Sequence, residues 1–208
     1  MSEADLEAQV RTADPDRWLS SRFVGDLAAR ADLMALYAFE AELMAIPTRA
    51  TQPLLAEMRY VWWREQMDGV FAGMARKGHP VLEALTDVVA RHRLERAPFD
   101  ALIEAHIGRV HGEPHDLDAF YVGPMQAAAH VLVKGADPAS VVGAARVWGL
   151  VQTGRTLEAG ARTEANRALR TLPTAAFPAV AHAAFRSASA PDALRRLQLT
   201  WTVLRGRI

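Results

Sequence analysis

The chain has 208 residues and is half hydrophobic, so it can bury a core of ordinary size and has the composition of a globular domain. Lysine plus arginine equals aspartate plus glutamate at 24 each, which leaves no excess positive charge to attract nucleic acid or an anionic membrane over long range. Cysteine is absent, which excludes disulfides, thiolate metal sites and cysteine nucleophiles.

The N-terminal stretch MSEADLEAQVRTADPDRW is acidic and lacks the apolar core of a secretory signal, so we expect a cytoplasmic protein. Alanine, leucine and arginine are abundant and strand-like alternation is nearly absent, which predicts an all-α chain. No repeat or low-complexity linker divides it, and we expect one domain over residues 1–208. No apolar run reaches the roughly 18 to 20 residues of a transmembrane helix, while peripheral attachment to a membrane stays open.

Apolar spacing and prolines predict the helices in chain order. The first covers Asp16 to Val24, and the second runs from about Asp26 to Ile46, where Pro47 stops it. The third begins at Pro53, runs to about Met74 and is expected to turn inward Leu54, Met58, Val61, Trp62 and Phe71. Later helices are expected at His79–Leu94, Pro98–Val110, Leu117–Lys134, Pro138–Leu157, Thr163–Leu172, Pro178–Arg186 and Pro191–Leu204.

Two of these helices carry the most specific patterns in the chain. They read ALYAFEAEL (35–43) and MRYVWWREQMD (58–68), and are followed in order by GHPV (78–81), DLDAFY (116–121) and GLVQTGRTLEAG (149–160). In this order the patterns resemble the squalene/phytoene synthase family of head-to-head prenyl transferases, over most of the chain. The resemblance implies an all-α isoprenoid synthase fold, here shortened in its C-terminal half.

In catalytic members, the resemblance implies two DxxxD motifs on facing helices, which hold Mg²⁺ against the diphosphates of two prenyl substrates. The matching positions are Met44 and Thr48 in the first motif, and Thr156 and Gly160 in the second. None of these residues has a carboxylate, whereas Mg²⁺ requires hard oxygen ligands in near-octahedral geometry. We therefore expect no catalytic residue, no resident metal and no cofactor.

Nearby glutamates are poor substitutes for the missing aspartates. Glu40 and Glu42 are two positions apart and point to different helix faces, and Glu158 is the one acid near the second motif. We expect them to be solvated or in salt bridges. The alternative is a prenyl transferase that binds Mg²⁺ through atypical ligands, which predicts acidic side chains converging on a deep cavity and Mg²⁺-dependent turnover of prenyl diphosphates.

The aspartate-free AFEAEL form and the LPTAAFPA and WTVLRGRI segments look most like the branch that includes the mitochondrial complex I assembly factor of eukaryotes. That likeness implies a non-catalytic assembly or scaffold factor with a protein partner in a respiratory membrane complex, peripheral to the inner membrane. It also implies a remnant pocket for an isoprenoid or quinone-like lipid. The candidate ligand-binding residues are Arg30, Tyr37, Glu40, Arg59, Trp62, Trp63 and Arg155.

The arginines of this set, together with Arg22, are expected in surface salt bridges. If they converge, they can instead bind a phosphate-bearing lipid or an acidic partner. Trp62 and Trp63 lie about 100° apart on a helix, so one is expected in the core while the other covers a groove or lines an apolar cavity. The chain has no nucleotide-binding or serine hydrolase motif and no basic-aromatic run, which argues against nucleic acid.

Three further features of the sequence indicate structure or function less specifically. His106, His111 and His115 are predicted to lie in an exposed polar loop, because Gly112 and Pro114 interrupt any helix there, with metal binding or pH sensing as the alternative. Arg64 and Asp68 are spaced for an i, i+4 ion pair. The final segment, residues 190–208, is amphipathic and is expected to dock on the core, with a membrane surface or a partner as the alternative.

Overall fold

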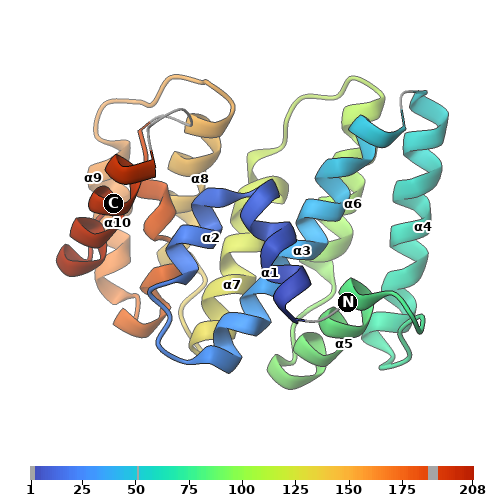
Figure 1. Ribbon diagram of the computed structural model, residues 1–208. Coiled ribbons are helices and arrows are strands. Elements are labelled where there is room, and N and C mark those ends of the chain that lie inside the picture. Colours follow the sequence, from blue (N-terminus) through green and yellow to red (C-terminus); the bar gives the residue numbers. More distant parts are fainter. Residues whose placement is uncertain (1–2, 51, 187–191) are drawn as a thin grey trace.

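The computed structural model describes residues 3–50, 52–186 and 192–208, and over these residues the protein is helical without any strand (Figure 1). Its α-helices are α1 (Glu3–Ala13), α2 (Pro15–Ser21), α3 (Leu27–Arg49), α4 (Pro53–Phe71), α5 (Pro80–His92), α6 (Ala97–Val110), α7 (Gly123–Leu132), α8 (Ala139–Gln152), α9 (Ala161–Ala168) and α10 (Asp192–Arg205). The prediction of an all-α fold is confirmed. In this part of the chain, no helix is both long and apolar enough to cross a bilayer.

Shorter helical turns complete the chain. A π-helical turn, η1 (Asp118–Val122), leads into α7, and the 3₁₀ turns η2 (Leu169–Thr171), η3 (Thr174–Ala179) and η4 (Ala181–Ala184) lie between α9 and α10.

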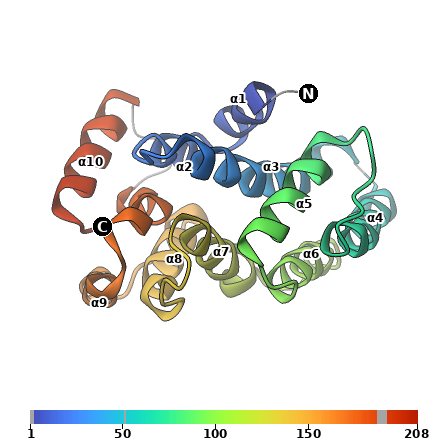
Figure 2. The ribbon, with the colours of Figure 1, turned by 90° about the horizontal axis from the view of Figure 1, so that it is seen from below.

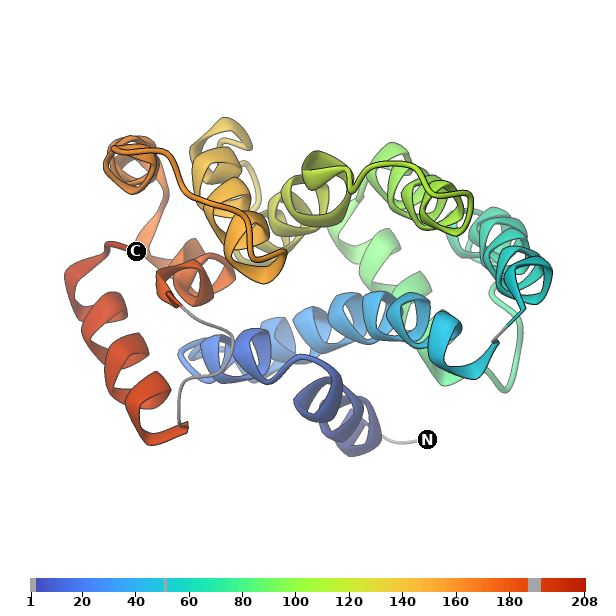
Figure 3. The ribbon, with the colours of Figure 1, turned by 90° about the horizontal axis from the view of Figure 1, so that it is seen from above.

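Helix α3 is the centre of the fold. Every residue from Asp32 to Ala41 is buried, and the helix contacts α1, α2, α4, α5 and α7. A helix that is buried all round must be covered on all sides, which explains why so many other helices pack on it. From above, α4, α6, α7 and α8 follow one another along one side of the molecule and α2 and α3 lie along the other, with α10 at the outer edge beside α2 (Figure 3). The view from below shows the same order (Figure 2).

Helix α3 extends past the proline that was predicted to stop it. Pro47 lacks the N–H that would bond to the carbonyl of Leu43 one turn earlier. The hydroxyl of Tyr60, on α4, donates to that carbonyl instead at 3.2 Å. Burial raises the pKa of Tyr60 to about 12, so the hydroxyl keeps its proton and remains a donor at neutral pH. A side chain from the neighbouring helix thus replaces the missing backbone bond, and α3 continues to Arg49.

The buried face of α4 differs from the predicted one. Leu54 and Met58 are exposed, whereas Val61, Trp62 and Phe71 are only partly buried. The core face consists of residues spaced by four and three positions, namely Ala56, Tyr60, Trp63, Met67 and Val70. This stripe runs along the helix without a break and packs on α5 and α6. The prediction was wrong for Leu54 and Met58, because it favoured leucine and methionine over a regular stripe that begins at a small alanine, whereas Trp62 and Phe71 pack against the core as expected.

The predicted ion pair between Arg64 and Asp68 is also absent from the structure. Arg64 donates to Glu104 of α6 at 2.7 Å, and Asp68 accepts from Arg96, just before α6, at 2.6 Å. Both side chains therefore connect α4 to α6 rather than to each other.

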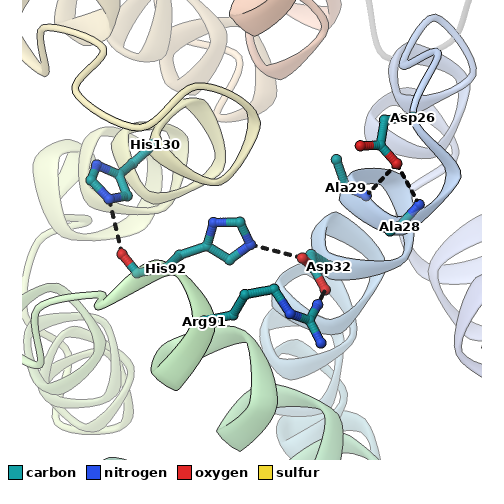
Figure 4. A network of polar contacts seen from close by, with 7 residues as sticks. All are labelled: Asp26, Ala28, Ala29, Asp32, Arg91, His92 and His130. Atoms are coloured by element: carbon teal, nitrogen blue, oxygen red, sulfur yellow. Dashed lines mark hydrogen bonds and ion pairs between the residues drawn. The ribbon is translucent and has the colours of Figure 1, made fainter.

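Polar side chains fix α3 against α5 and α7 (Figure 4). Asp32 is buried on α3, where Arg91 forms an ion pair with it and His92 Nε2 lies 2.7 Å from its second oxygen. His130 of α7 contacts the carbonyl oxygen of His92 at 3.1 Å. At the start of α3, Asp26 accepts from two backbone N–H groups of the first turn, as an N-cap residue does. This network holds the central helix α3 in place between α5 and α7.

Other boundaries differ from the predicted ones. α1 was not predicted, and the helix expected at Leu117–Lys134 begins with the π-helical turn η1. The helix expected at Pro138–Leu157 ends at Gln152, and the one expected at Pro178–Arg186 consists of 3₁₀ turns. Pro191, the expected start of the last helix, lies outside the described residues.

Candidate functional site

A cavity of about 710 Å³ lies between α2 and α3 on one side and α6, η1, α7 and α8 on the other. Its volume falls in the range of roughly 300 to 1,000 Å³ that is usual for small-molecule sites. The charged end is lined from α2, the middle of α3, η4 and α10 by Asp14, Asp16, Arg17, Glu40, His182 and Arg195. The apolar end is lined from the end of α3, the α3–α4 hairpin, α4 and α6 by Met44, Pro47, Pro53, Ala56, Leu102 and Val110, with Arg109 of α6 as its charged residue. These two sets of elements lie toward opposite ends of the molecule in Figure 3, so the cavity is amphipathic.

At the charged end, one arginine lies between two carboxylates. Asp14 is the N-cap of α2 and accepts from the backbone N–H of Arg17 at 2.9 Å, while Pro15 occupies the first turn. The guanidinium of Arg17 donates through Nε to Asp14 at 2.6 Å and through Nη1 to Glu40 of α3 at 2.7 Å. It also lies 4.6 Å from the ring centre of Tyr37, as a cation–π contact requires. The sequence Asp-Pro-Asp-Arg thereby closes the end of the cavity against α3.

Burial and charge act against each other in this group. Burial by itself would raise the pKa of Asp14, but the charge and hydrogen bonds of Arg17 hold it below the ordinary aspartate value. Burial raises the pKa of Glu40 although Arg17 lowers it. Burial would lower the pKa of Arg17, but Glu40 and Asp14 raise it further above its usual range. Arg17 therefore stays charged, and both carboxylates depend on it for compensation.

A second ion pair joins α2 to the C-terminal helix. Asp16 is buried on α2 and pairs with Arg195, which is buried on α10. Burial, with a smaller contribution from the charge of Asp14, raises the pKa of Asp16 to about 7 in spite of the nearby Arg195. The pKa of this carboxyl group thus lies close to neutral pH.

Two histidines in the lining, His115 and His182, have a buried ring nitrogen without a hydrogen bond within the described residues, and the one at the charged end is His182. It is 1 % exposed, its ring meets Trp148 edge-on at 5.0 Å, and its Nδ1 has no hydrogen bond within the described part of the chain. Burial lowers the pKa of His182 to about 3, so the ring is neutral at pH 7. A buried nitrogen without a partner costs free energy, which a ligand with a matching polar group can recover.

Aromatic rings form the cavity wall along α6 and η1. His106 stacks on Tyr60 at 5.1 Å and meets Phe120 edge-on at 4.7 Å, while His115 stacks on Phe120 at 4.2 Å. The π-helical turn places Phe120 in this wall. In the turn, the N–H of Gly123 bonds to the carbonyl of Asp118, five residues earlier. Pro124 has no N–H with which to continue an α-helical bond to the carbonyl of Phe120.

The prediction of an exposed histidine loop was wrong for His106. α6 runs to Val110, so His106 lies within a regular helix and shares its buried face with Phe99, Leu102 and Ile103. Burial lowers the pKa of His106 to about 4. His111 is exposed beyond the helix, as predicted, whereas His115 is partly buried and lines the cavity. In the described ranges, no three histidine or carboxylate side chains are arranged to hold a metal ion.

The candidate residues from the sequence are divided between the cavity and the surface. Tyr37, Glu40 and Met44 line the cavity. Thr48 is exposed and its hydroxyl donates to the carbonyl of Ala45 at 2.8 Å. The other motif positions and the arginine beside them lie exposed in the loop after α8, namely Arg155, Thr156 and Gly160. The second degenerate motif therefore lies outside the helix that was expected to carry it, and the residues of α8 in the wall are Trp148 and Gln152.

The paired tryptophans are not part of the cavity lining. Trp63 is buried against Phe39, with ring centres 5.5 Å apart, and both Trp62 and Trp63 pack on His79. The expectation that one of the two lies in the core is met by Trp63, whereas the alternative that one lines an apolar cavity is not supported by the lining. Arg22, Arg30 and Arg59 also lie outside the lining, and Arg22 pairs with Glu7 at 2.8 Å. The candidate arginines therefore do not meet at this cavity.

Sequence reasoning missed Asp14, Asp16, Arg17, His182 and Arg195. The Asp-Pro pair before a short helix is an N-cap signal that could have located Asp14 at a helix start. No local pattern indicates that His182 and Arg195, more than a hundred residues later, lie beside it.

The residues of the cavity do not fit a Mg²⁺ site. Three carboxylates face it, but Asp14 and Glu40 share the guanidinium of Arg17, and Asp16 pairs with Arg195. A divalent ion beside these arginines would meet like charge, and the carboxylate groups it needs are already in ion pairs. The four degenerate motif positions add no carboxylate.

Comparison with known proteins gives one positive result. A family model described as squalene/phytoene synthase matches residues 10–121, from within α1 through Tyr121 of η1. No curated protein and no solved structure matches the chain. The matched range includes α2 and α3 and therefore most of the charged end of the cavity.

Proposed function

Since the chain belongs to the squalene/phytoene synthase family, we propose that it is a non-catalytic member that binds an isoprenoid lipid in its cavity. We further propose that it serves as an assembly or scaffold factor for respiratory complex I or a related membrane complex. The observation that carries the first proposal is the pairing of the cavity carboxylates with internal arginines. Ionising a prenyl diphosphate needs divalent cations at the leaving group, and these carboxylates are committed elsewhere.

The charged end favours an uncharged headgroup. Its lining has three carboxyl groups and two arginines, each of which is in an ion pair. A diphosphate at this end would add negative charge next to Asp14 and Glu40 in a medium of low dielectric constant. A carbonyl or hydroxyl group can instead bond to the free Nδ1 of His182, which donates or accepts according to the tautomer. A quinone or a prenyl alcohol has this chemistry, and its chain suits the apolar end of the cavity.

Binding is tested with ligands that share one chain and differ in the headgroup. Farnesol and a short-chain ubiquinone are expected to bind to the purified protein, and farnesyl diphosphate at least about tenfold more weakly, since a like-charge contact of 1.4 kcal/mol already gives that ratio. EDTA should not change any of these affinities. Tight, Mg²⁺-dependent binding and turnover of farnesyl or geranylgeranyl diphosphate would contradict the proposal and establish the prenyl transferase alternative.

A matched pair of variants locates the headgroup. His182→Phe keeps a ring and removes the free nitrogen, and we expect it to weaken farnesol binding by about tenfold, the value of one hydrogen bond. His111→Phe makes the same change at an exposed position outside the lining and should bind as the wild type does. Equal affinity of both variants would exclude His182 as the headgroup contact. Urea unfolding of each variant shows whether it is folded before binding is compared.

The assembly role is supported by the likeness of the AFEAEL, LPTAAFPA and WTVLRGRI segments to the assembly-factor branch. It is tested in cells of the source by deleting the gene and measuring assembled complex I on native gels. We expect loss of the assembled complex and accumulation of subcomplexes, and recovery with the wild-type chain. Normal assembly after the deletion would remove this part of the proposal and leave the lipid-binding part intact.

A further inference from the structure

Helix α10 docks on the protein through a narrow and mostly polar face. Its buried residues are spaced by four and then three positions, at Arg195, Leu199 and Thr202. On this side the helix contacts η4 and α2. Arg195 pairs with Asp16, and the side chain of Gln198 donates to the carbonyl of Ala184 at 2.7 Å. The expectation that the final helix docks on the core is therefore met through this face, and Val203 and Ile208 also pack against the core.

The opposite face of α10 carries a solvent-exposed stripe of apolar side chains. Its large hydrophobic side chains are Leu194, Leu197, Trp201 and Leu204, which are spaced by three, four and three positions. Their exposed fractions are 59, 68, 57 and 74 %, in the same order. This spacing puts them on one side of a helix. Single exposed apolar residues are common on protein surfaces, but a continuous stripe of this kind indicates a surface that is covered when the protein acts.

The charges around this stripe indicate which kind of surface binds to it. The segment from Ala193 to Ile208 has four arginines and no acidic residue. Arg196, Arg205 and Arg207 are exposed, and the guanidinium of Arg205 lies 4.1 Å from the ring centre of Trp201. Two copies of this helix placed face to face would bring like charges together, whereas a surface of phosphate groups would complement them.

We propose that α10 docks the protein on a bilayer rich in anionic phospholipid. The helix lies in the plane of the membrane, with its leucines and Trp201 in the boundary between headgroups and acyl chains and its exposed arginines at the phosphates. Figure 3 shows α10 at the outer edge of the molecule, where such a surface can reach it. This inference does not rest on what the cavity binds, because the apolar stripe and the cavity lining lie on opposite faces of the helix.

The test is flotation of the full chain with vesicles of phosphatidylcholine alone or of phosphatidylcholine with phosphatidylglycerol. We expect binding to the mixed vesicles, weak binding to the neutral ones, and loss of binding in high salt. The double variant Leu197→Ser and Trp201→Ser should bind at least about tenfold more weakly, since each side chain loses its transfer into the apolar layer. Replacing Arg196, Arg205 and Arg207 by glutamine should weaken binding on the order of a hundredfold, about fivefold for each arginine.

The chain offers a matched control on α4. Leu54 and Met58 are exposed by 66 and 60 %, so Leu54→Ser with Met58→Ser removes a similar apolar area away from α10 and should leave binding unchanged. Trp201 is also the most exposed of the five tryptophans. Quenching of the fluorescence by brominated lipid should therefore disappear in Trp201→Phe, which keeps an apolar ring and still binds.

Three results would overturn the proposal. One is equal flotation with neutral and anionic vesicles, and another is wild-type binding by the Leu197→Ser, Trp201→Ser variant. The third is a dimer in sedimentation experiments that this variant dissociates, without vesicle binding by either protein, which would assign the stripe to a second copy of the chain. Since the changed side chains are exposed, thermal unfolding should be the same in all variants, and a variant that fails this check is replaced by Leu194→Ser with Leu204→Ser.

Discussion

Replacing Arg17 with methionine tests the charge balance of the cavity. The side chains of Arg17 and Glu40 are 11 and 9 % exposed, and methionine removes the charge while keeping much of the apolar stem. Removing one partner from a buried ion pair typically costs about 3 to 5 kcal/mol, because the remaining charge loses its compensation without regaining water. Here two carboxylates lose the same partner, so we expect a loss of unfolding free energy of about that size at pH 7.

The pH dependence of this loss identifies its cause. Without Arg17, the pKa of Glu40, which burial already raises, should rise further, and the pKa of Asp14 should rise from its lowered value. The folded variant then binds more protons than the unfolded chain, so its stability increases as the pH falls from 7 toward about 5. In the wild type, Asp14 acts in the opposite direction, since its stabilising contribution is lost as the pH falls through its lowered pKa. The gap between the two proteins should therefore narrow at pH 5.

Urea unfolding at both pH values measures these differences. The double variant Arg17→Met with Glu40→Gln should be more stable than Arg17→Met alone, because it has one buried carboxylate fewer. A control is Arg146→Met, which breaks an exposed pair with Asp118 and should cost less than about 1 kcal/mol at either pH. If Arg17→Met costs no more than this control and shows no change with pH, the network is solvated and the reasoning about the cavity fails.

Three further predictions follow from single contacts. Asp16 should titrate near pH 7 in carbon NMR. Because this pKa lies above the value in the unfolded chain, the contribution of Asp16 to stability is complete below about pH 4 and is lost as the pH rises through 7. Asp16→Asn should abolish this dependence of the unfolding free energy on pH. Tyr60→Phe should cost about 1 to 3 kcal/mol in urea unfolding by leaving the carbonyl of Leu43 without a partner. The cost should shrink when Pro47→Ala restores a backbone donor, and an unchanged cost would show that the hydroxyl does not serve this carbonyl. Gly143→Ala should lower stability by about 1 to 3 kcal/mol, because a Cβ there would lie 2.9 Å from the backbone of α9, whereas Gly25→Ala meets no atom within 4 Å and should have little effect on thermal unfolding.

The helices were largely predictable because their signals are local. Prolines at first turns, a break at the α3–α4 hairpin and apolar periodicity located most elements near their observed bounds. Failures occurred where a distant residue decides the outcome. Pro47 remains inside α3 because Tyr60, on the next helix, supplies a hydrogen bond, and no rule about the sequence near the proline includes that donor.

The cavity was predictable only from the residues of α3. Tyr37 and Glu40 belong to a recognisable motif, but their partner Arg17 lies on a short helix that carries no motif of its own. Arg195 stands beside Arg196 in an amphipathic segment, where both resemble solvent-facing residues. Only the packing of α10 on α2 turns one of them inward, because Asp16 is buried there. The sign and pairing of charges in a cavity depend on such tertiary contacts.

The ion pairs of Arg17 also determine how the protein responds to its surroundings. A site that balances its carboxylates with a dissolved ion changes its charge whenever the concentration of that ion changes. Here the balancing charge is covalently part of the chain and is present at a fixed ratio of one guanidinium to the two carboxylates of Asp14 and Glu40. The charge balance between Arg17 and these two carboxylates therefore does not depend on the cellular concentration of magnesium or of nucleotides.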